Sequence, residues 1–385
     1  MSHFCHLCGS DNLFLVGDFS ELPRVTSDCR PWAKGGAVAV CGTCATTQKV
    51  IDGPWQADAD AIYAGYALYN QSSTKTEQHR FDAASGFGQP RSAWILEQLA
   101  SHIGFAKPGR MLDLGCGIGV TLRAFHALAP SWRLEGFDPN LKDGRAVAAL
   151  PGVVAAHGGA LGDLPAGYGC ITCFHVLEHI VDPLPTLRAA RILLSDDGVL
   201  IIQVPYYHDN AFDLTIADHC SHFSPATLGP LLARAGLNIA LCSTDIVARE
   251  MTIVARPSEI QTLAPPDPAT EIAVVEAASV WLRRVLSVAA EAATHRPFGI
   301  FGTSIAGTLV ANFLGGNFDF FVDEDPTRIG ARHLDRPILS PAEIPQGSEL
   351  MVALMPRIAR AVAGRLSDKG YALRLPPETA VDEAL

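Results

Sequence analysis

Short apolar runs alternate with helix-length segments through the middle of the chain. The most regular run covers residues 110–114, and it leads into three glycines at alternate positions before helix-like sequence over 120–125. Further strand-like runs follow in the order 132–138, 169–174 and 198–205. This alternation of strands and helices predicts an α/β fold for this part of the chain.

The last third of the chain repeats the pattern on a smaller scale. A proline-rich boundary at 265–268 precedes a helical stretch over 269–294, and three strand-like runs follow within 298–307, 318–326 and 350–354. We therefore predict a second, smaller α/β sheet. The spacing of its glycines is irregular for a dinucleotide site and favours a substrate-gripping or structural role: Gly299, Gly302 and Gly307.

The glycine turn after residue 114 indicates where a ligand binds. Glycine permits a positive φ and a close approach of backbone to ligand, because no Cβ intervenes. A dinucleotide fingerprint would need its third glycine at position 120, where the chain has Val120. Asp113 precedes the turn, and its carboxylate suits a cationic ligand better than a pyrophosphate. S-adenosylmethionine (SAM), which carries an ammonium and a sulfonium group and no phosphate, fits this pattern.

The turn resembles the first motif of class I SAM-dependent methyltransferases, and two later features agree with this. Asp138 ends the next strand-like run roughly 20 residues further on, the usual place of a ribose-binding carboxylate. The segment 175–183 resembles the motif that follows the fourth strand in that family. The resemblance implies a Rossmann-type sheet, and it implies SAM contacts from these residues: Asp113, Gly115, Gly117, Gly119, Asp138, Ala160, Leu161 and His175.

Paired cysteines near the N-terminus indicate a metal site. Two C-x-x-C pairs are present, formed by Cys5, Cys8, Cys41 and Cys44. Four cysteine thiolates are the ligand set of a structural, tetrahedral zinc ion, with no position left for water. The metal would hold together a segment of about 50 residues that is too small to be stable on its own core. The alternatives are a redox pair, free thiols, or replacement of one ligand by Cys29 or, less readily, by His6.

The composition of the chain limits the cellular location and the binding partners that we expect. The 385 residues are 48% hydrophobic with a mean hydropathy of +0.19, which is typical of a well-packed chain of two or three domains. No run of about eighteen uncharged apolar residues occurs and no basic or apolar leader begins the chain, so we expect a cytoplasmic protein without a membrane partner. The net charge of −11, without a cluster of Lys or Arg, disfavours nucleic acid as a partner.

Residues 212–228, which follow the last strand-like run of the central region, contain two histidines and two aspartates. Together with the paired cysteines and the SAM motif, this segment resembles the C-methyltransferases that act on nucleotide-linked keto-deoxysugars. In that family a Glu-His pair follows a tyrosine, and the histidine is the general base. The resemblance implies that His219 is the base and that Asp218 orients it, whereas the tyrosine position falls on Ile216.

A histidine suits this chemistry. Methylation at carbon requires removal of a proton beside a carbonyl, because only the resulting enolate attacks the SAM methyl group. With an ordinary pKa of about 6.5 a histidine is largely neutral in the cytoplasm, and a neighbouring carboxylate stabilises its imidazolium. The alternative for His219 and His222 is a loop that caps the helix beginning at Ser224 and Pro225. His222 is expected to line the substrate site rather than to react.

Substrate contacts are less defined in the sequence. The family places an active-site tyrosine ahead of a serine pair, and here Tyr66 and Tyr69 both precede Ser72 and Ser73. Their spacing also suits one face of a core helix. Because Ile216 replaces the tyrosine, O- or N-methylation stays open. A separate alternative is a non-catalytic adaptor, in which the zinc module recognises a partner and the methyltransferase domain is a scaffold. A nucleotide diphosphate would need local cations, for which the candidates are Arg80, Arg91 and Arg249.

These observations predict three domains: a zinc-binding module at 1–60, a SAM-binding methyltransferase domain at 61–260 and a Rossmann-like domain at 261–385. The predicted activity is methyl transfer from SAM to a carbon of a nucleotide-linked keto sugar, with His219 as the general base. SAM and a structural zinc ion are the expected cofactors, and a small molecule is the expected partner. The sequence does not indicate the oligomeric state.

Overall fold

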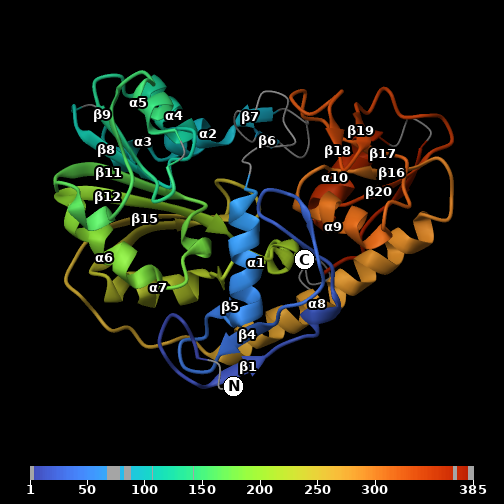
Figure 1. Ribbon diagram of the computed structural model, residues 1–385, viewed down its shortest axis with the longest axis horizontal. Helices are drawn as coiled ribbons and strands as arrows, with labels where there is room; N and C mark the ends of the chain where they lie inside the picture. Colours follow the sequence, from blue (N-terminus) through green and yellow to red (C-terminus); the bar gives the residue numbers. More distant parts are fainter. Residues whose placement is uncertain are drawn as a thin grey trace.

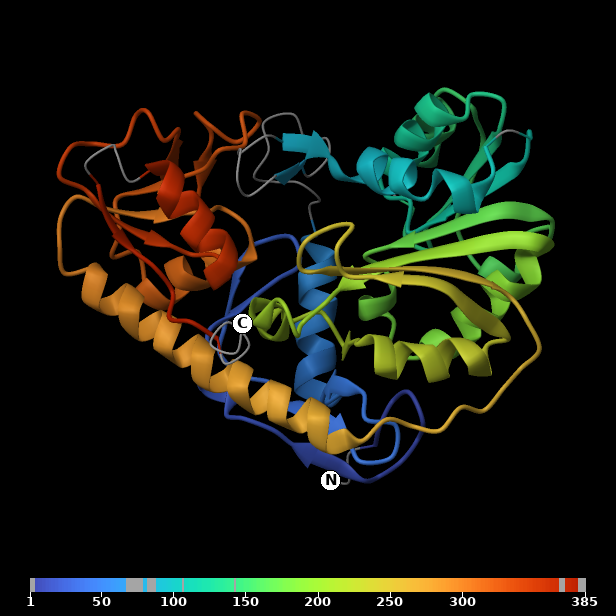
Figure 2. The ribbon, with the colours of Figure 1, turned by 180° about the vertical axis from the view of Figure 1, so that it is seen from behind.

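The structure is a computed structural model that describes residues 4–66, 79–81, 88–105, 107–141, 143–366 and 371–379. Two α/β lobes stand side by side, and the N-terminal segment lies below and between them (Figure 1). A long helix, α8 (Pro268–Ala292), runs from the N-terminal segment to the C-terminal lobe, as the view from behind shows (Figure 2). None of the helices in the described ranges has the length and apolar character that a membrane crossing needs.

The central lobe is built on a seven-stranded sheet. Its strands are β8 (Arg110–Leu114), β9 (Arg133–Phe137), β10 (Val153–His157), β11 (Tyr168–Phe174), β12 (Leu194–Pro205), β14 (Leu237–Ser243) and β15 (Glu250–Pro257). Their spatial order is β10-β9-β8-β11-β12-β15-β14. The first five of that order are parallel, and β15 and β14 are antiparallel to their neighbours at one edge. The predicted Rossmann-type sheet is confirmed.

Helices cover both faces of this sheet. One face packs against α6 (Pro183–Leu193) and α7 (Pro225–Arg234). The other packs against α2 (Arg91–Gln98), α3 (Ala100–Ile103), α4 (Val120–Leu128) and α5 (Gly144–Ala148). Alternate strand residues serve opposite faces, so Leu112 joins the first core and Met111 the second. Strands buried on both faces are apolar along their length, which explains why the sequence predicts them.

The N-terminal segment forms a four-stranded sheet in the order β1-β4-β5-β13. Three strands come from the segment itself: β1 (Leu13–Leu15), β4 (Val38–Cys41) and β5 (Thr47–Lys49). The fourth, β13 (Ser221–His222), belongs to the histidine-containing segment of the central lobe and pairs antiparallel with β5. The N-terminal module and the candidate base therefore share one sheet.

Smaller elements connect the module to the central lobe. A short 3₁₀ helix, η1 (Phe19–Glu21), precedes a hairpin of β2 (Arg24–Val25) and β3 (Pro31–Trp32). Helix α1 (Gly53–Ala64) stands between the lobes in Figure 1, and the predicted domain boundary at residue 60 falls inside it. Its first turn is capped by Asp52, whose side chain accepts a hydrogen bond from the Trp55 amide at 2.8 Å. A second hairpin, β6 (His79–Phe81) and β7 (Gly88–Pro90), precedes α2.

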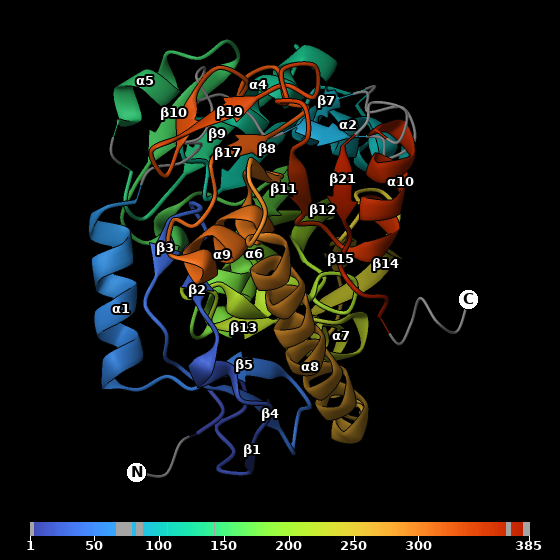
Figure 3. The ribbon, with the colours of Figure 1, turned by 90° about the vertical axis from the view of Figure 1, so that its right-hand side faces the viewer.

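The C-terminal lobe is the smaller α/β sheet that the sequence predicts. It has six strands, β16 (Phe298–Phe301), β17 (Phe320–Val322), β18 (Arg332–His333), β19 (Arg336–Leu339), β20 (Glu349–Val352) and β21 (Ala372–Arg374). Their order is β18-β19-β17-β16-β20-β21, with β18 alone antiparallel. Helices α8 and α9 (Ile305–Leu314) cover one face, and α10 (Pro356–Leu366) covers the other. Figure 3 shows α8 passing from this lobe down to the strands of the N-terminal sheet.

One apolar core connects the C-terminal lobe to the rest of the molecule. It contains Leu282 of α8, Val40 of β4 and Phe212 of the histidine-containing segment, each at most 1% exposed. Because α8 contributes to this core along its length, it fixes the C-terminal lobe relative to the N-terminal segment and the candidate base.

Candidate functional site

The glycine turn between β8 and α4 has the backbone conformation that its sequence implies. Gly115, Gly117 and Gly119 have φ values of +73°, +49° and +78°. A Cβ at Gly115 would lie 2.3 Å from Val176 Cγ2, and one at Gly119 would lie 2.3 Å from Leu150 Cδ1. Neither position accepts a side chain without displacing its neighbour. The turn is also tied to β9, because the Gly115 and Cys116 amides donate hydrogen bonds to the Phe137 carbonyl at 2.7 and 3.1 Å.

Both predicted acidic ligands lie at this edge of the sheet. Asp113, in β8, is 2% exposed and accepts a hydrogen bond from Thr172 Oγ1 at 2.6 Å. Burial raises its pKa to about 7, and within the described residues this carboxylate takes part in no ion pair. Asp138 follows β9, is partly exposed and accepts a hydrogen bond from the Asn140 amide at 2.9 Å. A ligand cation beside Asp113 would supply the missing charge.

The other predicted SAM contacts follow the neighbouring strands. Ala160 and Leu161 lie after β10, where the 3₁₀ helix η2 (Leu161–Asp163) begins. His175 lies directly after β11, with a φ of +55°. Its Nδ1 is 3.2 Å from Glu178 Oε1, and its Nε2 is 3.3 Å from Glu250 Oε2. Although burial opposes the charged ring, these carboxylates raise the pKa of His175 to about 9.

The candidate base lies in a buried histidine cluster. It follows the 3₁₀ helix η4 (Ala211–Thr215), and His219 is 3% exposed. Its Nδ1 is hydrogen-bonded to Asp213 Oδ1 at 2.8 Å, and the other oxygen of Asp213 bonds His222 Nδ1 at 2.5 Å. Burial opposes charge on His219, but Asp213 raises its pKa above the ordinary value. For His222 burial prevails and lowers the pKa to about 4.

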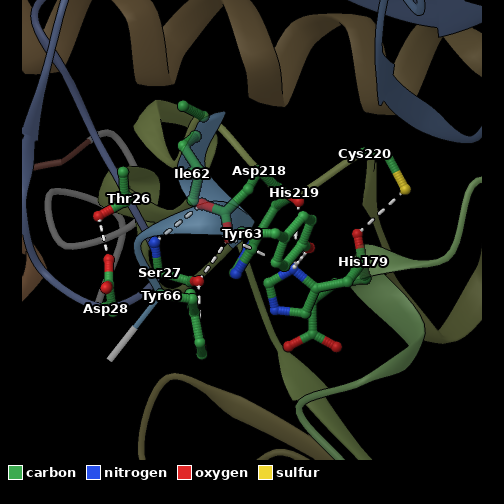
Figure 4. A network of polar contacts seen from close by, with 12 residues as sticks. Thr26, Ser27, Asp28, Ile62, Tyr63, Tyr66, His179, Asp218, His219 and Cys220 are labelled. Atoms are coloured by element: carbon green, nitrogen blue, oxygen red, sulfur yellow. Dashed lines mark hydrogen bonds and ion pairs between the residues drawn. The ribbon is translucent and has the colours of Figure 1, made fainter. Parts of the chain in front are cut away.

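The prediction that Asp218 orients His219 is wrong, because the carboxylate bonded to His219 is that of Asp213. The chain turns between residues 213 and 219, which brings the two side chains together, whereas Asp218 points to the loop after β2. There Asp218 accepts hydrogen bonds from the Ser27 amide at 2.8 Å and the Ser27 hydroxyl at 2.5 Å (Figure 4). Adjacency in sequence therefore did not indicate the partner.

Two further titratable side chains lie around His219, and neither has a role in the sequence-based prediction. The His179 ring, from the 3₁₀ helix η3 (Leu177–His179), packs edge to face on the His219 ring with centroids 4.6 Å apart. His179 Nδ1 lies 3.0 Å from the Tyr63 hydroxyl and 3.1 Å from the Asp218 carbonyl. The Glu178 carboxylate is 1% exposed and contacts His175. The sequence does contain a signal for these two groups, because titratable residues occur one helical turn apart within 175–179.

Of the two predicted tyrosines, Tyr66 and Tyr69, the structure describes the first. Tyr66 follows α1 and accepts a hydrogen bond from the Ser27 hydroxyl at 3.4 Å, which places it in the same polar network as Asp218 (Figure 4). Tyr69 lies outside the described residues. Ile216, which occupies the position of the family tyrosine, is 5% exposed and packs in the apolar core.

The four predicted zinc ligands converge on one point. One sulfur from each of Cys5, Cys8, Cys41 and Cys44 lies within 4.8 Å of the others. The Cys5–Cys44 and Cys8–Cys41 sulfur pairs are each 3.6 Å apart, close to the roughly 3.8 Å that tetrahedral zinc with Zn–S bonds of about 2.3 Å requires. Neither Cys29 nor His6 belongs to this group.

Hydrogen bonds to the sulfurs also fit a metal-thiolate site. The amides of Thr43 and Cys44 donate to Cys41 Sγ at 3.4 and 3.5 Å, and Gln48 Nε2 donates to Cys5 Sγ at 3.1 Å. The residues after each pair, Gly9 and Ala45, have φ values of +77° and +59°, and their amides close each turn by donating to the Cys5 and Cys41 carbonyls at 2.8 Å. These residues therefore fit a Cys₄ zinc ion.

A large cavity lies between the central and C-terminal lobes. Its volume is about 670 Å³, and the three predicted cations Arg80, Arg91 and Arg249 all line it. On the opposite side it is lined by residues that follow β16, β17 and β20. Glu250 connects the cavity to the site described above, since it lies 3.0 Å from Arg91 and 3.3 Å from His175.

Comparison with known proteins identifies the central lobe. Residues 90–241 match a family described as "Methyltransferase domain". C-methyltransferase NovU of Streptomyces niveus is 23% identical over 280 residues, which cover 66% of this chain and 60% of NovU. Ubiquinone biosynthesis O-methyltransferase of Xanthomonas campestris pv. campestris is 30% identical over 135 residues, which cover 31% of this chain and 53% of that protein. The chain thus spans less than two thirds of the length of either relative.

Among solved structures, the comparison returns the N,N-8-amino-8-demethyl-D-riboflavin dimethyltransferase RosA of Streptomyces davawensis. It is 21% identical, with a TM-score of 0.35 over 43% of this chain and 55% of RosA. The family match includes β8 to β12 with the glycine turn, and it ends before the C-terminal lobe. This part of the chain is a SAM-dependent methyltransferase domain with the class I fold.

Proposed function

We propose that this protein transfers a methyl group from SAM to a carbon of a nucleotide-linked keto sugar, with His219 as the general base. The observation that carries the proposal is the position of residues 175–179. Val176 packs on Gly115 of the glycine turn, and His179 packs on the His219 ring. One short segment therefore contacts both the predicted cofactor site and the predicted base.

The cofactor site would be formed by the carboxyl ends of β8, β9 and β10. Asp113 would face the cationic methionine portion, Asp138 the ribose hydroxyls, and the residues at Ala160 and Leu161 the adenine. The positive φ of the three glycines lets the backbone approach SAM closely. SAM supplies the electrophilic methyl group and leaves as S-adenosylhomocysteine.

The contact with Asp213 prepares His219 for proton abstraction. When Asp213 accepts the Nδ1 hydrogen, the neutral ring has its free lone pair on Nε2, which can take the proton from the carbon beside the substrate carbonyl. The positive charge that develops on the ring is stabilised by the Asp213 carboxylate. The enolate carbon then attacks the methyl group, and the C–S bond of SAM breaks as the new C–C bond forms.

The zinc ion in this proposal is structural. Cys5, Cys8, Cys41 and Cys44 would occupy all four positions of a tetrahedral ion, so no position remains for substrate or water. The metal would fix β4 and β5, and β5 in turn pairs with β13, which carries His222.

O-methylation is a second candidate, and the similarity to the Xanthomonas O-methyltransferase favours it. The same base could remove a hydroxyl proton, because His219 does not distinguish an acidic C–H from an O–H. The absence of an aromatic hydroxyl at Ile216 is compatible with either acceptor.

Methyl-labelled SAM and a panel of nucleotide-linked keto sugars, analysed by NMR, test the proposal. Label on a carbon, with exchange of the adjacent proton in solvent, is expected; label on oxygen would replace the C-methylation by the second candidate. His219→Ala should abolish turnover with SAM affinity nearly unchanged, whereas His102→Gln, a histidine outside the cluster, should keep both. Wild-type rates in His219→Ala would discard the mechanism.

A further inference from the structure

A lysine from the N-terminal segment contacts the histidine-containing segment at both ends of one loop. The amide of Lys49, the last residue of β5, donates a hydrogen bond to the Cys220 carbonyl at 2.9 Å. The Lys49 ammonium donates a second hydrogen bond to the Leu214 carbonyl. Leu214 directly follows Asp213, and Cys220 directly follows His219. One residue therefore bridges the two points of the chain that lie next to the carboxylate and the candidate base.

The loop between these two contacts, residues 214–220, is also bonded to the N-terminal segment at its middle. The Ala217 amide donates to the Val25 carbonyl at 2.8 Å, and the Ala217 carbonyl accepts a hydrogen bond from Trp55 Nε1 at 3.0 Å. These bonds hold the tip of the loop, whereas Lys49 bonds its two ends. The ends are the points at which the loop joins the carboxylate and the base, so their separation decides whether the two groups meet.

The Lys49 ammonium is buried, which argues against a role in packing alone. Lys49 is 5% exposed, and burial lowers its pKa to about 7. Asp213 and Asp218 favour the charged ammonium, whereas Arg24 opposes it. Because an ammonium loses free energy when it leaves water, an apolar side chain of similar length would fill this space at a lower cost. The hydrogen bond that the ammonium makes explains a lysine here better than packing does.

The contact between Asp213 and His219 is sensitive to the position of this loop. His219 Nδ1 lies 2.8 Å from Asp213 Oδ1, and such a hydrogen bond is lost once the two atoms are more than about 3.6 Å apart. Asp213 also has a second partner, because its other oxygen bonds His222 Nδ1 at 2.5 Å. His222 is held separately by the pairing of β13 with β5. A loop that opened would therefore leave Asp213 on His222 and deprive His219 of its carboxylate.

We propose that Lys49 is a positioning residue for methyl transfer, which holds the loop 214–220 closed so that Asp213 stays bonded to the base. The inference rests on the proposed function for the role of His219 as the base. Lys49 acts through Asp213 and His219 and takes no part in the proton transfer itself. The N-terminal segment thereby contributes to catalysis through β5 as well as through its cysteine cluster.

NMR of the histidine rings in the full-length protein, labelled only at its histidines, tests the inference without any methyl transfer. The signal of His219 is the one that is missing from His219→Gln. In the wild type we expect the pKa of His219 to lie above the ordinary value of about 6.5, because Asp213 bonds the ring. In Lys49→Met the loop can open, so the pKa of His219 should fall toward the ordinary value.

Lys49→Met should also lower kcat by about tenfold to 100-fold, which is the size of effect that a displacement of about 1 Å at a catalytic group can have. SAM affinity, measured by calorimetry, should be unchanged and shows that the variant is folded. Lys49→Arg, which retains a cationic donor, should recover part of kcat and of the pKa of His219. If Lys49→Met does not bind SAM, Lys49→Gln, whose amide ends one bond short of the ammonium, takes its place with the same expected result.

The matched comparison is Trp55→Phe, which removes a side-chain donor to the tip of the same loop and should have the smaller effect on both quantities. Equal effects in the two variants would overturn the inference, because any loosening of the loop would then be sufficient. An unchanged or increased pKa of His219 in Lys49→Met would also overturn it, since an increase is what loss of a nearby cation alone would cause. A decrease in a protein that does not label carbon would retain the inference and reject the proposed C-methylation.

Discussion

At the residue scale, the hydrogen bond between His219 and Asp213 is the contact on which catalysis would depend. Asp213 is 1% exposed and is shared by two histidine rings, and a proton on either ring compensates its charge. This arrangement favours the imidazolium at His219, which is the ring with the raised pKa.

Exchange of Asp213 for Asn should lower kcat by at least about 100-fold, because the carboxylate that orients the base and stabilises its charged form is lost. The same change removes the cause of the raised pKa, so the acidic limb of the kcat/KM profile should move to lower pH. Asp218→Asn is the matched comparison, since this carboxylate bonds Ser27 and not His219. If the acidic limb of the kcat/KM profile were unchanged in Asp213→Asn, or moved further in Asp218→Asn, Asp213 would not be the carboxylate that orients His219.

His175 offers a test through stability. Because Glu250 and Glu178 raise its pKa to about 9, its charged form stabilises the folded state. This stabilisation is fully present below the unfolded-state pKa of about 6.5 and is lost as pH rises through about 9. Denaturant unfolding of His175→Gln should therefore show its largest deficit, at most about 3 kcal/mol, below pH 6.5 and little deficit above pH 9. A deficit independent of pH would exclude this electrostatic origin.

At the element scale, the glycine turn combines a constrained backbone with a close neighbour. Gly115 and Gly104 have nearly equal φ values, +73° and +74°, but a Cβ at Gly115 would overlap Val176, whereas one at Gly104 would have nothing within 4 Å. The two positions therefore separate backbone strain from crowding.

Gly115→Ala should weaken SAM binding by about tenfold or more, because the turn must shift to relieve the contact with Val176. Gly104→Ala should introduce a similar backbone strain and lower the free energy of unfolding by about 1 kcal/mol, while SAM affinity is retained. Calorimetric titration with SAM and thermal unfolding of both variants measure the two effects. Equal SAM affinity in the two variants would show that crowding at Gly115 does not matter.

The sequence predicts the elements better than the contacts between them. The parallel strands are apolar along their length, and the glycine turn and the paired cysteines carry local signals, so all three are predictable. The Asp213–His219 contact depends on a reversal of the chain that no local pattern indicates. The cavity is assembled from residues as distant in the chain as Arg80 and Arg357, and the pairing of β13 with β5 joins Ser221 to Gln48. The contact, the cavity and the strand pairing are therefore visible only in the folded structure.

At the scale of the whole molecule, metal binding should affect the stability of the whole protein and not only that of the N-terminal segment. We expect one zinc ion per chain by elemental analysis, and its loss in Cys41→Ser together with a lower melting temperature. Cys29→Ser is the control, since Cys29 is buried but lies outside the cluster, and it should retain the metal. Full occupancy in Cys41→Ser, or metal loss in Cys29→Ser, would contradict the ligand set.

The strand β13 has a consequence for any attempt to recombine this protein. Two residues that complete the sheet of the N-terminal segment, Ser221 and His222, come far later in the sequence and follow the candidate base His219 closely. A chimera that exchanges the first fifty residues for those of a relative would present a foreign edge to this strand, and the position of His219 would shift with it. Grafts that carry both segments together should retain turnover where grafts of either one alone do not.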